Sequence, residues 1–330
     1  MQSSDFDPQS YKVWFRRPTI FVTVSWMLLC AACGIIAPKL IDPIANILKT
    51  LGIRSSKYRL TLIADALYRI LVMLLPPLLY ARSHEGVGAS LRLKRPNLAA
   101  SVYAGIIGMA LVPLSRTMTV LWTLLLQTLG AEVSYAVRAP VNFSQLILWL
   151  VLDGCLSGIC LEMMFHGGLF AGWERRGGER ALFAITLFYA AFHGSVQEFP
   201  VHLIIGLTTG LVTMYSGSVF CGMMSHVFYG VLMIALDAAN GSFETTSLLY
   251  AVVQEGRLPS YLASFAFSGA LLALLLFIDR LIGRKRGTWP GFLKVERPEA
   301  MSASEVLILT VAILTVLSSC AESFISICRF

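Results

Sequence analysis

Apolar residues occur in this chain as long runs, separated by short polar or basic segments. A helix needs roughly 20 apolar residues to cross a hydrocarbon core about 30 Å thick. Because such runs recur along the sequence, we predict an all-α, polytopic membrane helix bundle with about eight or nine transmembrane helices. The predicted spans lie near residues 20–36, 60–80, 98–130, 143–173, 181–198, 201–216, 219–239, 261–282 and 304–327.

Two of these runs contain residues that interrupt helices. Pro76 and Pro77 are expected to kink or end the second span, because proline lacks the amide hydrogen that a helix interior uses. Pro113 and Arg116 interrupt the third run, which leaves open either one kinked, tilted helix or a helix followed by a half-helix. A helix lying in the membrane interface is predicted for the semi-polar stretch 41–59, from the spacing of Ile44, Ile47, Leu48 and Leu51.

The composition agrees with a membrane protein and changes how the charge is interpreted. The chain is 56% hydrophobic and 14% charged, whereas soluble domains are about 25% charged. The net charge of +7 comes largely from basic clusters at helix ends, which favour the cytoplasmic side. We therefore predict no nucleic-acid partner. The same preference predicts an inner N-terminus and an outer C-terminus, although the basic stretch Lys39–Arg59 would then lie outside, contrary to the preference. The clusters placed inside are Arg92–Arg95, Arg175–Arg180 and Arg280–Arg297.

Several charged residues lie within the predicted spans. Asp65 and Arg69 are four residues apart on one helical face, where they neutralise each other as a structural pair. Asp153 either lines a cavity or forms a helix–helix hydrogen bond, and Arg116 is its candidate partner. A small-solute transporter would also explain such residues, but the sequence shows neither internal repeats nor paired broken helices.

The strongest chemical signal is a carboxylate and two histidines in neighbouring predicted helices. Ionisable residues inside a bilayer are costly, so Glu162, His193 and His226 are expected to face the bundle interior and to mark a functional site. His166 follows Glu162 by four residues and shares its helical face. A structural Glu–His hydrogen bond would also account for that pair.

Two chemical uses of these residues are open. Glu162 and a histidine can activate a water molecule while the other histidine donates to the developing oxyanion. Alternatively, a divalent ion such as zinc would take nitrogen and oxygen ligands of this kind. The metal set would be Glu162, His166, His193 and His226.

The residues around these positions carry a family pattern. Glu162-Met-Met-Phe-His166-Gly, then Tyr189-Ala-Ala-Phe-His193, then His226-Val-Phe-Tyr-Gly230 follow one another in order. The order, together with the linking segment, resembles the CPBP family of integral-membrane endopeptidases. That family contains the CAAX prenyl endopeptidase and bacterial relatives linked to bacteriocin processing or immunity. The resemblance covers residues 145–240.

The chain departs from the family pattern at four positions. The pattern reads Glu-Glu-x-x-x-Arg, Phe-x-x-x-His and His-x-x-x-Asn or Asp. Leu161 replaces the first glutamate, which is thought to activate water, and Gly230 replaces the last residue, a proposed oxyanion donor. His166 stands in place of the arginine and Tyr189 in place of the phenylalanine.

The resemblance implies an intramembrane endopeptidase of glutamic type, a class formerly viewed as metalloproteases. Its implied roles are Glu162 as base with help from His193, and His226 as oxyanion donor, without a required cofactor. A catalytically inactive pseudoprotease that binds, confers immunity or assists maturation is the alternative. The candidate supporting residues are His166, Tyr189 and Asp153.

The expected organisation is one membrane domain in three parts. Residues 1–142 form N-terminal helices, 143–240 form the CPBP-like core, and 241–330 form C-terminal helices. The expected partners are a peptide or lipidated protein substrate and membrane lipid. The compact loops favour a bacterial plasma membrane, and an endoplasmic-reticulum location is the alternative.

Overall fold

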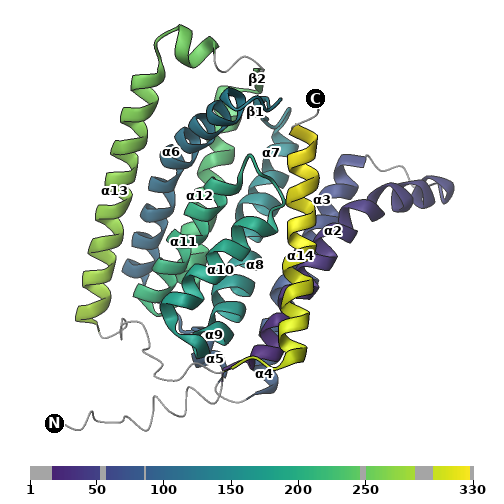
Figure 1. The fold of residues 1–330 in the computed structure, drawn as a ribbon, viewed down its shortest axis with the longest axis vertical. Helices are drawn as coiled ribbons and strands as arrows, with labels where there is room; N and C mark the ends of the chain where they lie inside the picture. Colours follow the sequence, from purple (N-terminus) through teal and green to yellow (C-terminus); the bar gives the residue numbers. More distant parts are fainter. Residues whose placement is uncertain (1–16, 53–56, 85–86, 246–249, 287–299, 328–330) are drawn as a thin grey trace.

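The structure is a computed structural model that describes residues 17–52, 57–84, 87–245, 250–286 and 300–327. Nearly all of these residues are helical, and the long helices run side by side (Figure 1). The helices before the site are α2 (Ile20–Thr50), α3 (Lys57–Tyr68), α4 (Leu75–Ser83), α5 (Val87–Ser90) and α6 (Leu98–Thr128). Those that follow are α7 (Phe143–Trp149), α8 (Ser157–Glu162), α9 (Phe170–Trp173), α10 (Gly178–Phe192), α11 (Phe199–Ser216), α12 (Val219–Asn240), α13 (Leu258–Lys285) and α14 (Ala303–Ile327).

Shorter elements complete the fold. A two-stranded antiparallel sheet joins β1 (Tyr135–Val137) to β2 (Phe243–Thr245), with Ala136 opposite Glu244. Wider π-helical turns and one 3-10 turn connect several α-helices without breaking the helical path. They are η1 (Arg69–Leu74), η2 (Leu150–Leu156), η3 (Met163–Leu169), η4 (Glu174–Arg176) and η5 (Tyr250–Gln254).

The helices have the length and composition of a polytopic membrane protein, which confirms the predicted fold class. Within the described part of the chain, seven helical stretches are long and apolar enough to cross a membrane, and the bent helix α2 makes eight. The two parts of α2, 20–36 and 39–50, meet at 51°. The second part includes the exposed Ile44 and Ile47 of the predicted interfacial helix.

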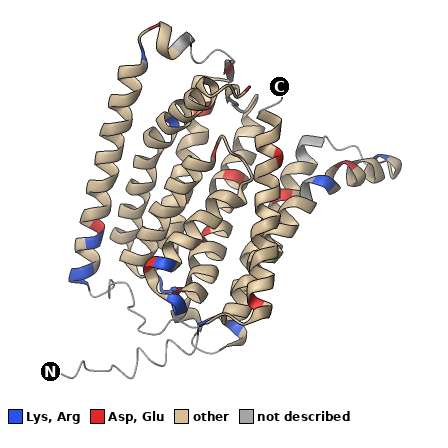
Figure 2. Ribbon diagram, viewed as in Figure 1, with Lys and Arg blue, Asp and Glu red and all other residues tan. Residues whose placement is uncertain are grey.

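One end of the bundle gathers the basic side chains. Figure 2 shows blue Lys and Arg segments clustered at the lower ends of the helices, including the C-terminal end of α13. At the same end, the buried Glu174 forms an ion pair with Arg17 at 3.0 Å and accepts a hydrogen bond from Arg92 at 2.7 Å. Helix α2 starts at this end and α14 ends at the opposite end (Figure 1). Because basic residues favour the cytoplasmic side, this arrangement is compatible with the predicted inner N-terminus, which stays a prediction.

The proline-containing spans are continuous helices. Pro76 and Pro77 fall at the start of α4, directly after the π-helical turn η1, and the helix runs on to Ser83. The extra residue in η1 lets the path continue where proline offers no amide hydrogen. In α6, Pro113 lies inside a single helix, which decides the alternative left open by the sequence. Arg116 of α6 pairs with Asp237 of α12, so the predicted Arg116–Asp153 pair is wrong.

The helix predicted for residues 181–198 is shorter than expected. It is α10, which has 15 residues and ends at Phe192, so that His193 follows the helix instead of lying within it. Gly194 comes next with φ of 66°, a left-handed conformation that glycine adopts readily. The chain then reaches Glu198, the N-terminal cap of α11. Residues 193–198 therefore form a tight connection between two antiparallel helices.

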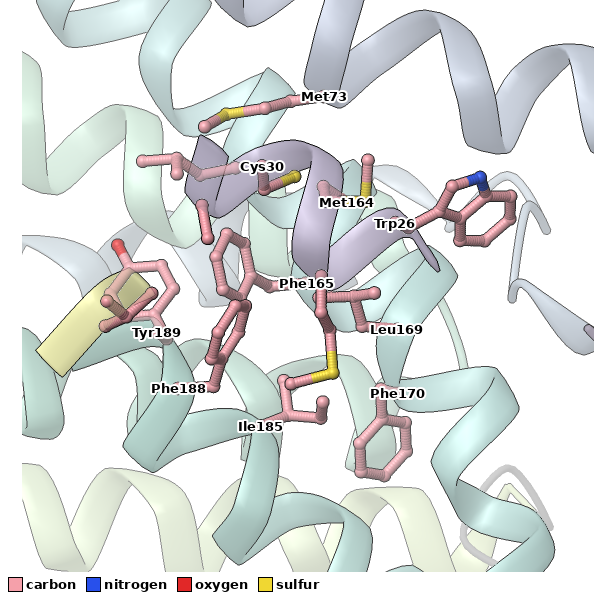
Figure 3. Packing of buried hydrophobic residues seen from close by; sticks show 14 of the residues in the cluster. Trp26, Cys30, Met73, Met164, Phe165, Leu169, Phe170, Ile185, Phe188 and Tyr189 are labelled. Carbon is pink, nitrogen blue, oxygen red and sulfur yellow. The ribbon is translucent and has the colours of Figure 1, made fainter. Parts of the chain in front are cut away.

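The largest apolar cluster surrounds the helix that carries Glu162. Phe165 is fully buried, and its ring centroid lies 5.9 Å from that of Phe188 and 5.1 Å from that of Tyr189. Figure 3 shows Phe165 and Phe188 packed between helices, with Leu169 and Ile185 nearby. Leu161, only 5% exposed, belongs to the same cluster. The site described below therefore rests on a dense apolar core.

Close helix crossings depend on glycine, which supplies a first testable prediction. At Gly108 of α6, a Cβ atom would lie 1.9 Å from the backbone oxygen of Ser225 in α12. We expect Gly108→Ala to push α6 and α12 apart and to destabilise the protein by about 2–3 kcal/mol, the cost of overpacking. Thermal unfolding in detergent measures the loss. Gly269→Ala is the matched control, because its Cβ would meet Leu114 at an ordinary 3.8 Å; equal unfolding temperatures for both variants would contradict the prediction.

Candidate active site

A buried carboxylate joins two histidines at the centre of the bundle. Glu162 ends α8 and is fully buried. Its Oε2 lies 2.6 Å from Nδ1 of His166, one turn further along, and its Oε1 lies 2.8 Å from Nδ1 of His226 in α12. The predicted Glu162–His166 proximity is therefore confirmed, and both carboxylate oxygens have an imidazole partner.

Three glycines make room for this arrangement. A Cβ at Gly222 of α12 would lie 3.0 Å from Oε2 of Glu162. A Cβ at Gly210 of α11 would lie 2.9 Å from Nε2 of His166, and one at Gly158 would lie 3.2 Å from Cβ of His226. Small residues allow membrane helices to approach closely. Here they allow α8, α11 and α12 to enclose the polar side chains.

A second pair of histidines lies at the α10–α11 connection. The ring of His193 stacks on that of His202, with centroids 3.6 Å apart and planes at 13°. Nδ1 of His193 lies 2.8 Å from the Tyr189 carbonyl oxygen, and Nδ1 of His202 lies 3.1 Å from that of Glu198. A carbonyl oxygen can only accept, so each Nδ1 carries the hydrogen. In the neutral rings, Nε2 then keeps its lone pair and is available as a base.

Tyr189 stands between the two histidine pairs. It is fully buried, and its ring centroid lies 4.9 Å from His193, 6.2 Å from His166, 6.3 Å from His226 and 6.4 Å from His202. The chain has five histidines, so four of them surround one tyrosine. The structure thus gathers Glu162, His166, Tyr189, His193 and His226, which the sequence proposed from three separate helices.

Asp153, also proposed from the sequence, lies in a different polar network. Its carboxylate is 3.5 Å from Arg69, which also pairs with Asp65 at 2.6 Å and donates to the Leu152 carbonyl oxygen at 3.3 Å. The Asp65–Arg69 pair is confirmed. Asp153 therefore links η2 to η1 and has no contact with the Glu162 cluster among these interactions.

His202 was not among the site residues proposed from the sequence. The signal in the sequence was the short separation along the chain between His193 and His202. A short connection between antiparallel helices returns the first turn of the second helix to the end of the first. His202 lies in the first turn of α11, and His193 directly follows α10. If residues 193–198 are recognised as a loop, the two rings are expected to lie close together.

The metal set proposed from the sequence, Glu162, His166, His193 and His226, stays a prediction. In the described ranges, no group of three or more His, Cys, Asp or Glu side chains is arranged to hold a metal ion. His166 and His226 direct their Nδ1 atoms at the Glu162 oxygens, so in the neutral rings only Nε2 keeps a lone pair.

His193 opens onto a cavity of about 490 Å³. Gly34 of α2 and Phe192 line it on the side of the core, and α14 closes the other side with Ser319 and Glu322. Its walls therefore come from helices far apart in the sequence. The cavity gives the free Nε2 of His193 room for a water molecule or a peptide.

A bundle of spanning helices with one carboxylate and several imidazoles at its centre defines a polytopic membrane protein with an intramembrane polar site. Residues 143–232, from the start of α7 into α12, match the family model described as type II CAAX prenyl endopeptidase, Rce1-like. This segment thus belongs to the CPBP family, as the motifs predicted. At the level of the family, this match supports a CAAX-protease-like membrane peptidase, and the spanning helices make the protein an integral, multi-pass one. No curated protein and no solved structure matches the chain.

The structure gives physical meaning to two departures from the family pattern. Leu161 is packed in the apolar core, 5% exposed, next to the buried Glu162. Gly230 lies against Gly154 of η2, where an added Cβ would be 3.1 Å from the Gly154 Cα atom. Both positions are adapted to tight packing between helices.

Proposed function

We propose that this protein is an intramembrane endopeptidase that hydrolyses a peptide bond of a peptide or lipidated protein held beside His193. The observation that carries the proposal is that His193, with its Nδ1 bound to a carbonyl oxygen, lines a cavity, while the Tyr189 ring contacts both His193 and the carboxylate-bound His226. Family membership supplies the reaction class. The geometry supplies a base, a second polar ring and a space for the reacting atoms.

In the proposed reaction, His193 acts as general base. Its Nε2 accepts a proton as the water oxygen attacks the carbonyl carbon, and returns that proton to the leaving nitrogen when the C–N bond breaks. Glu162 holds Nδ1 of His226 at 2.8 Å, which fixes the orientation of the ring. In the proposed reaction this oriented ring is the polar group that stabilises the oxyanion.

Glu162 is better suited to orienting histidines than to deprotonating water. Both of its oxygens are within 2.8 Å of an imidazole nitrogen, and its side chain is fully buried. Each carboxylate oxygen already accepts from an imidazole, which makes the group a weaker base toward a water molecule. We therefore assign Glu162 the role of holding His166 and His226, and His193 the role of base.

The test compares peptide termini in cells that express wild type or His193→Ala at equal levels. We expect new termini in wild type and a fall of about 10²–10⁴-fold in their formation in the variant, the range for loss of a general base. His84→Ala is the control, because His84 is exposed and stacks on Tyr80, away from the cluster. Unchanged termini in a folded His193→Ala protein would rule out the assigned role.

A pseudoprotease remains the second candidate, favoured by one observation. Leu161 puts an aliphatic side chain in the core where the family pattern has its water-activating glutamate. A protein of this kind would bind the peptide in the same cavity without cutting it. Identical termini in wild type and His193→Ala cells, together with capture of an intact peptide by the purified protein, would select this function.

A further inference from the structure

The cavity beside His193 contains a carboxylate that lies outside the family-matched segment. Glu322 of α14 lines this cavity together with His193, and residues 143–232 are the matched segment. We propose that Glu322 supplies the carboxylate that works with His193 on the hydrolytic water, in place of the acidic side chain missing at Leu161. The proposal rests on the proposed function and names a further catalytic residue for it.

Helix α14 is fixed directly on the chain around His193. The Val196 amide donates to Oγ of Ser323 at 3.2 Å, and the Cys320 thiol donates to the Ala191 carbonyl oxygen at 3.4 Å. A Cβ at Gly194 would lie 3.1 Å from Cβ of Ser319. These contacts on both sides of His193 hold the end of α14 in a defined position relative to the imidazole.

The face of α14 that meets the cavity is polar within an otherwise apolar helix. Four polar residues spaced by three or four positions share one helical face, and all of them line the cavity: Ser319, Glu322, Ser323 and Ser326. The neighbouring Leu317, Phe324 and Ile325 are exposed apolar residues. Glu322 is exposed near the end of α14 and lines the cavity together with His193, so its carboxylate shares one polar surface with the imidazole.

The chemistry needs two acceptors at one water molecule. As the water oxygen bonds to the carbonyl carbon, one hydrogen passes to Nε2 of His193 and the other is held by the Glu322 carboxylate. The first proton then goes to the nitrogen as the C–N bond breaks, which releases an amine. The second is lost when the new carboxyl group ionises. No oxidant, metal or further reactant is required.

The experiment uses the peptide whose new terminus depends on His193. Its cleavage in proteoliposomes is measured for wild type, Glu322→Gln and Glu305→Gln. Glutamine keeps the shape of Glu322 but is not a base, so we expect cleavage to fall at least 100-fold, the lower end for acid–base catalysis. Glu305 is the matched control: it lies on the same helix at the other end, where it accepts from the Ser302 amide at 2.8 Å. A wild-type rate in Glu322→Gln would overturn the proposal, whereas absence of cleavage in wild type would overturn the proposed function instead.

A chemical rescue separates catalysis from folding. Glu322→Ala removes an exposed side chain, so we expect the variant to fold and to be inactive. Added formate, a small carboxylate that fits the enlarged cavity, is expected to restore part of the cleavage, while chloride at equal ionic strength is not. No rescue of a folded, inactive Glu322→Ala protein would assign Glu322 a structural role and overturn the proposal.

Discussion

Glu162→Ala is expected to abolish peptide processing and to lower the unfolding temperature of the protein. The carboxylate is fully buried and accepts from His166 at 2.6 Å and from His226 at 2.8 Å. Its removal leaves two buried N–H donors without a partner, each at a cost of about 1–3 kcal/mol. It also frees the His226 ring to rotate away from the oxyanion. Cleavage and thermal unfolding are measured on the same detergent preparation.

Two further variants sharpen this experiment. Glu179→Ala is the control for removal of an acidic side chain, because Glu179 is exposed at the start of α10. Glu162→Gln keeps the volume but places an amide N–H₂ against one imidazole donor, so it is expected to lose activity with a smaller loss of stability. Wild-type cleavage by a folded Glu162→Ala protein would exclude any role for the carboxylate in catalysis.

The second large effect is expected from Leu161→Glu combined with Gly230→Asn. On sequence alone, this double variant restores the residue types of the family pattern. In the structure, Leu161 is 5% exposed and surrounded by apolar side chains. A carboxylate there loses its hydration without a compensating partner, which costs several kcal/mol. We therefore expect a less stable protein with no gain in cleavage.

Gly230→Asn adds a steric cost to the electrostatic one. Its Cβ would approach the Gly154 Cα atom at 3.1 Å and the Gly154 oxygen at 3.2 Å. These are backbone atoms, which cannot rotate aside, so α12 and η2 must separate. Urea or thermal unfolding of the two single variants assigns the loss to each site. Cleavage above the wild-type rate by the double variant would show that the packing adapts and that the missing residues alone limited activity.

The helices were predictable where one apolar run corresponds to one span. The predicted spans 219–239 and 304–327 agree closely with α12 (Val219–Asn240) and α14 (Ala303–Ile327). The error at α10 came from assuming that every helix needs about 20 residues. A helix surrounded by others, such as α10 with eight buried positions of 15, need not cross the bilayer alone. The polar residues 193–198 were therefore assigned to a helix instead of a loop.

The site was predictable only in its local part. Helical spacing gave the Glu162–His166 pair, because residues four apart share a face. The Glu162–His226 hydrogen bond joins residues 64 positions apart, and the Arg116–Asp237 pair joins residues 121 positions apart. Such contacts depend on how helices rotate and cross, which the apolar pattern of a single helix does not specify. Glu322 is also a long-range neighbour of His193, whereas His202 is separated from His193 by one short loop.

The position of α14 has a consequence for the time at which the protein acquires its activity. This helix packs along α2 and forms one wall of the cavity at His193. During translation, Glu162 and the four clustered histidines enter the membrane well before α14 is made. A nascent chain inserted through α12 thus carries the imidazoles without an enclosed reaction space. Hydrolysis would therefore begin only after α14, the helix that carries Glu322, has been synthesised and has packed against α2.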